Sequence, residues 1–584
     1  MLHLQDATLR VGRAGQTILQ NVTLQYGRPH FGAVIGPSGC GKSTLLKVIA
    51  GLLEPQEGQL HWNGRDVEEK DIEPAELGYV PQFSICQPAL TVRETLDEAL
   101  RLRVRGLSAA AREERLQKVL ALVGLQEIPD RRNRMLSGGQ LRRLGLGLEI
   151  VSEPRLLLCD EVTSGLDPNS EDDIVRLLRD LAREGQRLVL SVTHSLSHLE
   201  LYDSVTVLKE GRVVYCGAPD HLLHYFQVET PNEIFARLAG HSGKEWAELW
   251  NEHAASYLVP ATMPEEEKPG ATEDAPAADE GEAESPAEDE PAAEPMAQPA
   301  GVLTQFFILL ARRWRLFFRA KGEVVLQVTL LFLFPAMVVP FAFHGLPQIQ
   351  NLSLGLDITV TEQFRETLDF TKQTSQVGGL VSGLIMFQVI LMTLMGSNNG
   401  AREIVSERLL YEKERLAGLS PGAYLSSKVV YVFFLVLVQS VWMTIFVRVI
   451  CQFPGDLISQ GLMLFLANAA LTYLTLAVSA WSDTTEQSSL ISIYFVGFQL
   501  PLSGALLAMP ELLGSITRPF IAAYWSWSGF LQTLRGVQSQ YYDLAAAITD
   551  TPLSSLEACT WVLVWHVVAG IVIAYFGCVA SRWR

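Results

Sequence analysis

The segment GPSGCGKST at 36–44 carries residues suited to phosphate chemistry. It fits the pattern G-x-x-x-x-G-K-[ST], follows the apolar run FGAVI and opens the helical run STLLKVIAGLL. Glycines in such a turn let backbone N–H groups surround phosphates at a helix N-terminus. We expect Lys42 to bring a positive charge to the phosphates and the Ser43 hydroxyl to bind Mg²⁺. The predicted ATP-binding residues are Gly36, Pro37, Ser38, Gly39, Cys40, Gly41, Lys42, Ser43 and Thr44.

Two carboxylates end a second apolar run, LLLCDE at 156–161. Strands that end in acidic residues are common, but a position downstream of a phosphate-binding loop favours a catalytic interpretation. Asp160 is predicted to hold Mg²⁺ through water, and Glu161 to polarise the water that attacks the nucleotide.

The sequence LSGGQ at 136–140 precedes the helical run LRRLGLGLEIVSE. A serine and two glycines at a helix N-terminus form a second anion-binding end. One phosphate-binding loop has no use for a second such end, so Ser137, Gly138, Gly139 and Gln140 are predicted to bind the nucleotide of another subunit.

These motifs lie in a region where short apolar runs alternate with helical stretches, to about residue 217. That alternation is typical of an α/β domain with a largely parallel sheet. A helical tail follows. The predicted domain order is an α/β domain at 1–226, its helical tail at 227–260, an acidic linker at 261–300, an amphipathic helix at 301–322 and an all-α membrane domain at 323–584.

The formal charge of −18 is concentrated in the linker, which contains roughly thirteen carboxylates and a single cation, Lys268. Its Pro, Ala and Glu composition buries too little apolar surface to order the chain, so we expect a disordered spacer. A regulatory docking tail is the alternative. No basic patch with interleaved aromatic residues is present, which argues against a nucleic-acid partner.

The second half contains apolar stretches long enough to cross roughly 30 Å of hydrocarbon. The six predicted spans are 324–343, 377–397, 429–447, 457–481, 488–509 and 558–580. The run PFIAAYWSWSGFL is too short to span and is expected to be interfacial or re-entrant on the outer side. Lys and Arg residues concentrate in the predicted inner segments, which places both termini in the cytosol.

The three motifs of the first half resemble those of the ATP-binding-cassette (ABC) ATPases over about residues 2–226. The resemblance implies that Gln82 in YVPQ contacts Mg²⁺, that Asp167 in SGLD lies at a dimer interface, and that His194 in SVTH contacts the γ-phosphate. Without the family, Gln82 and His194 would each be interpreted as an ordinary loop residue. The aromatic residue that usually stacks on adenine is missing, because the expected region offers only Val11 and Arg13.

The order of ATPase first and six spans second resembles the subfamily G half-transporters with ABC-2 type membrane domains. In that family the loop between the second and third spans, here 398–428, contains a coupling helix that rests on the ATPase; a solvated helix face is the alternative for its charges. The outer segment at 345–376 is longer and more polar than the family pattern, whereas 510–557 follows it. The family's translocation path runs between the second and fifth spans, which here contribute Met386, Phe387, Phe495, Phe498 and Gln499.

The resemblance therefore implies an ATP- and Mg²⁺-dependent exporter of a hydrophobic or amphipathic substrate, in the plasma or inner membrane. A homodimer is the simpler assembly, because each hydrolytic element is present in this chain; a heterodimer is the alternative. A second functional hypothesis is an ATP-driven membrane switch that acts on a partner protein without transport. Cys451 and Cys559 both fall near the outer face, and separate thiols are favoured over a disulfide.

Overall fold

The computed structural model describes residues 1–12, 15–257, 298–342, 360–505, 510–535 and 539–581. The chain divides into two compact units. The first consists of Met1–Gly301 with Lys413–Leu419, and the second of Val302–Glu412 and Ser420–Arg582. Nearly all of the predicted linker at 261–300, the residue Arg13 and the first part of the outer segment at 345–376 lie outside the described residues.

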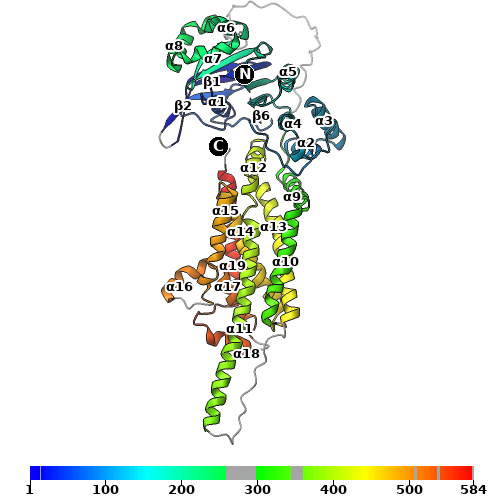
Figure 1. Cartoon of the computed structure of the whole chain (residues 1–584), viewed down its shortest axis with the longest axis vertical. Coiled ribbons are helices and arrows are strands. Elements are labelled where there is room, and N and C mark those ends of the chain that lie inside the picture. The colour runs from blue at the N-terminus through cyan, green and yellow to red at the C-terminus, as the bar shows by residue number, and fades with distance from the viewer. Residues whose placement is uncertain (13–14, 258–297, 343–359, 506–509, 536–538, 582–584) are drawn as a thin grey trace, which may run out of the picture. The chain divides into compact units, whose positions relative to one another are not determined.

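A six-stranded sheet in the first unit carries the predicted nucleotide-binding motifs (Figure 1). Its strand order is β10-β9-β3-β8-β7-β6, with β10 antiparallel to β9 and the other neighbours parallel. The strands are β3 (His30–Ile35), β6 (Leu77–Val80), β7 (Leu156–Asp160), β8 (Leu188–Val192), β9 (Ser204–Lys209) and β10 (Arg212–Gly217). The parallel strands are buried along their whole length, which explains why they are apolar runs without alternation.

A second, antiparallel sheet completes the core of this unit in the order β2-β1-β4-β5. Its strands are β1 (Leu2–Val11), β2 (Gln16–Tyr26), β4 (Glu57–Trp62) and β5 (Arg65–Asp66). A buried hydrogen bond of 2.6 Å between the Tyr26 and Thr206 hydroxyls joins the two sheets. The predicted α/β class of the first domain is confirmed.

Helices connect these strands and cover the six-stranded sheet. They are α1 (Lys42–Ile49), α2 (Val92–Arg103), α3 (Ala109–Leu122), α4 (Gly138–Ile150), α5 (Pro168–Glu184), α6 (Pro219–Phe226), α7 (Ile234–Ala239) and α8 (Gly243–His253). A buried ion pair between Arg103 and Glu149, 2.8 Å apart, ties α2 to α4. Helix α4 therefore has a fixed position relative to its neighbour.

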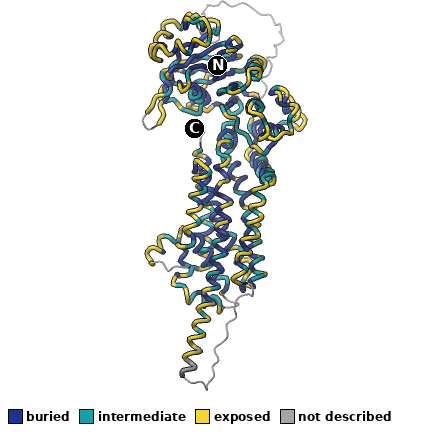
Figure 2. The backbone as a smooth tube through the Cα atoms, viewed as in Figure 1, coloured by how far each residue is buried: buried dark blue, intermediate teal, exposed yellow. Residues whose placement is uncertain are grey.

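The second unit is helical, as predicted. Its main elements are α9 (Val302–Arg319), α10 (Lys321–Ala342), α11 (Val360–Gly400), α13 (Pro421–Cys451), α14 (Leu457–Trp481), α15 (Thr485–Gly497), α16 (Glu511–Thr517), α17 (Ala522–Gln532), α18 (Ser539–Ile548) and α19 (Leu556–Ala580). Helix α12 (Arg408–Leu416) is divided between the units, with its residues from Lys413 in the first. Helix α14 packs against α11, α13, α17 and α19 and is the most buried of the helices long enough to span a membrane in the described residues (Figure 2). Helix α11 extends well past its predicted span, and residues 364–376 are mostly exposed (Figure 2).

Five helices of the described residues, not six, are long and apolar enough to cross a membrane. The expected fifth span at 488–509 is interrupted: α15 ends at Gly497, a 3₁₀ turn follows at Pro501–Ser503, and Gly504 has a φ of 75°. Proline lacks a backbone donor and breaks the helical ladder. The 13 residues of α15 cover only about 20 Å at 1.5 Å per residue. The hydropathy of the segment thus overstated the length of its helix.

Buried polar side chains join four of the long helices. The Gln439 side chain on α13 accepts a hydrogen bond from Asn399 on α11 at 2.8 Å and from Asn468 on α14 at 3.0 Å. Its own amide donates to Gln327 on α10 at 2.9 Å. Inside an apolar unit such amides need partners, so this cluster fixes how the four helices pack.

Candidate active site

The phosphate-binding loop connects the end of β3 to α1. Gly36 has a φ of 152°, and a Cβ there would lie 2.3 Å from the Leu208 carbonyl oxygen and 2.8 Å from Cys40 Sγ. No side chain fits this position, so the motif's first glycine is required by the close approach of β9. The Lys42 ammonium is buried and donates to the carbonyls of Gly36 and Pro37, each at 3.0 Å. The loop thereby holds its cation where phosphates would meet it.

Ser43 and Asp160 come together at the foot of the loop. The Ser43 hydroxyl donates to Asp160 Oδ1 at 2.9 Å, and the Tyr79 hydroxyl lies 3.4 Å from Oδ2. Burial raises the pKa of Asp160, and the Ser43 hydrogen bond opposes that rise. A hydroxyl and a carboxylate offer the hard oxygen ligands that Mg²⁺ prefers. The donor set therefore fits the metal that the sequence predicts.

Glu161 is the centre of a second cluster. The Gln82 amide donates to Glu161 Oε2 at 2.8 Å, and His194 Nε2 lies 2.7 Å from Glu161 Oε1. The three residues follow the ends of the adjacent strands β6, β7 and β8, whose carboxyl ends share one edge of the sheet. The structure thus brings the predicted catalytic carboxylate together with Gln82 and His194, the two residues to which the family resemblance gives roles at the ATP site. Glu161 itself has a φ of 52°, a left-handed backbone unusual for a side chain of its size.

The LSGGQ residues occupy a different place in the unit. Ser137 is the N-cap of α4 and forms a capping box with Gln140, so the two glycines open a helix whose N-terminus is exposed. Across the described residues, no hydrogen bond joins this motif to the phosphate-binding loop. Asp167 likewise caps a helix, by accepting a hydrogen bond from the Ser170 amide at the start of α5. In the described residues, neither the LSGGQ motif nor Asp167 is hydrogen-bonded to the phosphate-binding loop of its own chain.

Two contacts in the site were not predicted from the sequence. The Tyr79 hydroxyl reaches Asp160 from β6, and the Arg142 guanidinium donates to the carbonyls of Gln82 and Glu161, at 3.0 Å and 2.9 Å. Arg142 follows LSGGQ by two positions, but only the register of α4 shows that it faces the carboxylate strand. No signal in the motif distinguishes it from Arg143, which pairs instead with Asp173.

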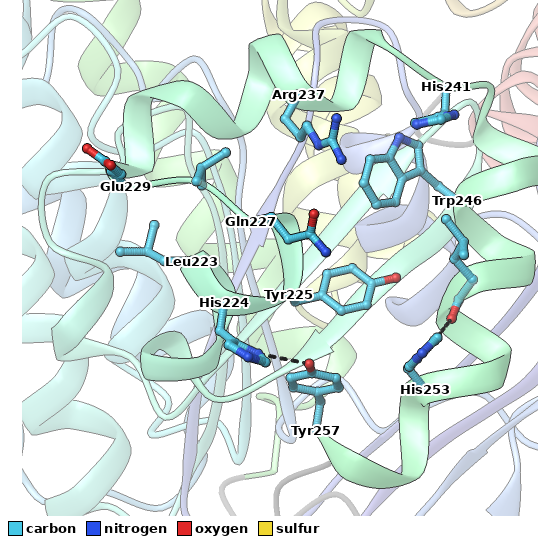
Figure 3. A pocket seen from close by; sticks show the side chains of 12 residues that line it. Leu223, His224, Tyr225, Gln227, Glu229, Arg237, His241, Trp246, His253 and Tyr257 are labelled. Carbon is cyan, nitrogen blue, oxygen red and sulfur yellow. Dashed lines mark hydrogen bonds between the residues drawn. The ribbon is translucent and has the colours of Figure 1, made fainter.

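A cavity of about 500 Å³ lies elsewhere in the first unit, among α6, α7 and α8 (Figure 3). Tyr225, Trp246 and Tyr257 form its aromatic walls, and Arg237 and Gln227 point into it (Figure 3). No residue of the predicted ATP site lines this cavity, so it is separate from the hydrolytic chemistry.

The residues predicted to line a path in the second unit differ in accessibility. Phe495 and Phe498, at the end of α15, have exposed rings. Met386 is buried in the hydrophobic core of the unit, and Phe387 is half-buried against it. Gln499 is buried, and its side-chain oxygen accepts a hydrogen bond from the Ala523 amide at 3.0 Å. Both cysteines of this unit that the sequence singled out, Cys451 and Cys559, are free thiols.

The charges of the loop at 398–428 do not form a solvated helix face. Glu403 is buried and pairs with Arg313 on α9 at 2.6 Å and with Lys428 on α13 at 3.1 Å. Lys428 also pairs with Glu407 at 2.7 Å. These pairs join the loop to separate helices and do not leave its charges in solvent. The loop is thereby fixed to the helices that precede and follow it.

Comparison with known proteins identifies both halves of the chain. Residues 19–164 match the ABC transporter family, and residues 304–528 match the ABC-2 type transporter family.

Three relatives share these halves to different extents. The ABC transporter ATP-binding/permease protein Rv1747 of Mycobacterium tuberculosis is 30% identical over 508 residues, which cover 84% of this chain and 53% of the relative. The methionine import ATP-binding protein MetN 2 of Paraburkholderia xenovorans is 40% identical over 34% of this chain and 53% of its own. The ABC transporter G family member 23 of Arabidopsis thaliana is 36% identical over 35% of each chain. The chain thus spans about half the length of the first two of these relatives.

Proposed function

Because the chain is an ABC transporter polypeptide, with an ABC ATPase domain followed by an ABC-2 type membrane domain, we propose that two copies form a homodimer that exports a hydrophobic or amphipathic compound at the expense of ATP. The observation that carries the proposal is the cluster of Glu161 with Gln82 and His194, beside the Ser43–Asp160 pair. These contacts support the proposal because they gather in one chain the groups to which hydrolysis is assigned, apart from an LSGGQ motif facing the nucleotide.

The proposed roles follow from the geometry. The loop amides and the Lys42 ammonium bind the phosphates of ATP. Ser43, Asp160 and Gln82 would hold Mg²⁺, which neutralises charge on the phosphates. Glu161 accepts a proton from the attacking water, and His194, hydrogen-bonded to it, orients the carboxylate toward the γ-phosphate.

The dimer is proposed because the LSGGQ helix end is exposed and is not hydrogen-bonded to the loop of its own chain in the described residues. An exposed, capped N-terminus with two glycines is a site for a phosphate presented by another subunit. A second, identical chain provides that phosphate most simply. Asp167, at the start of α5, is proposed to lie at the same interface.

For the membrane half, we propose a mostly apolar path near the end of α15, where Phe495 and Phe498 are exposed, and beside α11, which packs against α15. The loop at 398–428 is proposed to couple the ATPase to this path, because its buried ion pairs make it a rigid element. The ATPase domain and both termini are proposed to be cytosolic, in a plasma or inner membrane.

The experiment is the ATPase rate of the full chain in lipid, measured for the wild type and for Glu161→Gln across a panel of amphipathic compounds and lipids. Asp173→Asn is the matched control, because Asp173 is an exposed carboxylate on α5 that pairs with Arg143 and is not bonded to the cluster in the described residues. We expect hydrolysis by the wild type and the control, loss of at least about a hundredfold in Glu161→Gln, and a rate that one chemical class changes several-fold.

Two other outcomes separate the alternatives. A wild type that hydrolyses ATP but responds to no compound favours the switch that acts on a partner protein, which the long exposed outer part of α11 would serve. An inactive wild type contradicts the homodimer and directs the search to a second, different half.

A further inference from the structure

Arg142 connects three parts of the ATPase domain that are far apart in the sequence. It lies on α4, five residues after the N-cap Ser137, so its Cα is about 7.5 Å along the helix from the LSGGQ end. Its Nη1 atom donates to the Gln82 carbonyl at 3.0 Å and to the Glu161 carbonyl at 2.9 Å. One guanidinium nitrogen therefore holds the main chain of the two residues whose side chains also bond to each other.

The main chain at Glu161 needs such support. Its φ of 52° places it in a sparsely populated region for a residue with a long side chain, and such conformations persist only where the surroundings enforce them. The Glu161 amide donates to the Val192 carbonyl at 3.1 Å, which fixes one side of the residue. Arg142 fixes the other side. Burial lowers the pKa of the Arg142 guanidinium, and the Glu161 carboxylate opposes this, but the group stays charged because an arginine pKa is far above neutral.

We propose that Arg142 is a positioning residue that transmits the state of the LSGGQ motif to Glu161 and Gln82 of the same chain. The inference rests on the proposed dimer, in which the partner's ATP contacts the N-terminus of α4. A helix moves as a rigid rod over one to two turns, so a displacement at Ser137 displaces the Arg142 guanidinium. The two carbonyls that it holds then move with it.

The consequence is communication between the two ATP sites. Nucleotide bound to the partner's loop would set the alignment of the catalytic carboxylate in this chain, and the reverse would hold by symmetry. Hydrolysis would then depend cooperatively on ATP concentration. The proposal goes beyond the catalytic groups themselves, because in the described part of the chain Arg142 is hydrogen-bonded to the main chain of Gln82 and Glu161 and not to their side chains or to the nucleotide-binding loop.

The neighbouring arginine provides a matched control. Arg143 lies one residue further on the same helix but turns about 100° away and pairs with the exposed Asp173 at 3.0 Å. Arg143→Gln removes the same charge from the same helix without affecting the two carbonyls. Arg142→Lys keeps the charge but offers a point donor in place of a planar fork.

The test compares wild type, Arg142→Gln, Arg142→Lys and Arg143→Gln as full chains in lipid nanodiscs, with ATPase rates measured over a range of ATP concentrations. We expect Arg142→Gln to lower kcat by at least about tenfold with a KM within about threefold of wild type. We also expect its Hill coefficient to fall to 1 from a higher wild-type value. Arg142→Lys should recover part of kcat, and Arg143→Gln should match the wild type within about twofold.

Hydrogen exchange keeps the inference testable apart from the proposed function. Binding of a slowly hydrolysed ATP analogue should protect the peptides that cover residues 79–83 and 158–164 in the wild type and in Arg143→Gln, but not in Arg142→Gln. An unchanged kcat and Hill coefficient in Arg142→Gln would overturn the inference, as would equal protection in Arg142→Gln and the wild type. If the wild type itself does not hydrolyse ATP, the proposed function fails and the exchange pattern alone decides the role of Arg142.

Discussion

Gly36 and Gly39 lie in the same phosphate-binding loop, but the structure gives them different sensitivity to a side chain. At Gly36 a Cβ would lie 2.3 Å from the backbone oxygen of Leu208, a strand residue that cannot move alone. At Gly39, with a φ of 78°, no heavy atom lies within 4 Å of the added carbon. Alanine at both positions therefore separates backbone strain from steric overlap.

The magnitudes follow from these two terms. A left-handed backbone costs a non-glycine residue about 1–2 kcal/mol, which is the whole expected effect of Gly39→Ala. Gly36→Ala adds forced overlap in a packed core, which costs about 1–3 kcal/mol. We therefore expect a loss of about 4 kcal/mol for Gly36→Ala and about 1 kcal/mol for Gly39→Ala. At about 3 °C per kcal/mol for a domain of this size, the shifts in Tm are about 12 °C and 3 °C.

The assay is thermal unfolding of the full chain in detergent without nucleotide. The measured quantity is the Tm of the ATPase-domain transition. ATP is omitted because an added methyl group would also contact the nucleotide and change its binding, which would alter the Tm by a separate route. Equal Tm shifts for the two variants, or a larger shift for Gly39→Ala, would refute the assignment of Gly36 to the close approach of β9.

Three further outcomes are expected. Glu149→Gln should lower the Tm of the ATPase domain by several degrees, because burial alone would raise the pKa of Glu149 but Arg103 and Lys413 hold it at about 2. Because the pKa of Glu149 is lower in the folded state, the stabilisation by its carboxylate is present above the ordinary glutamate pKa near 4.3 and is lost as the pH falls toward 2. The Tm of the Glu149→Gln variant should therefore change less than that of the wild type between pH 5 and pH 3. Arg313→Met should cost about 3 kcal/mol by removing one partner of buried Glu403, and the double variant Arg313→Met with Glu403→Met should be more stable than the single one in the same unfolding assay. Asn468→Leu should destabilise the membrane unit by about 1 kcal/mol, because a buried hydrogen bond to Gln439 is lost; a Tm equal to that of the wild type would contradict the packing role of the amide cluster.

The sequence predicted the parts of the site whose chemistry depends on local geometry. The loop at 36–44 and the carboxylates at the end of β7 are each specified by a few consecutive residues, and parallel strands bring their carboxyl ends to one edge of the sheet. Contacts that depend on helix register could not be predicted from the sequence. Arg142 and Arg143 are neighbouring residues of the same type, and only the packing of α4 decides which one faces Glu161.

The membrane half shows the same distinction. Hydropathy located the helices, but it could not show that Pro501 and Gly504 end the fifth apolar segment early. Nor could the charge pattern of the loop at 398–428 indicate partners as remote as Arg313, ninety residues earlier. Long-range pairs depend on the packing of whole helices, which sequence spacing does not encode.

The early end of α15 also bears on the lipid that the protein can tolerate. Beyond Gly497 the α-helix gives way to turns: the Gln499 amide donates to the Val496 carbonyl at 3.0 Å and the Leu502 amide to the Phe498 carbonyl at 3.2 Å. At Gly504 a side chain takes over, because the Thr551 hydroxyl donates to the Gly504 carbonyl at 2.6 Å. Irregular backbone at membrane depth survives only where protein shields it. A thicker bilayer would place more of this stretch in hydrocarbon and a thinner one less, so we expect hydrophobic mismatch to act on α15 more directly than on the five longer candidate spans of the described residues. We therefore expect sterol content and acyl-chain length to affect the conformation at Phe498, at the point where the helix ends.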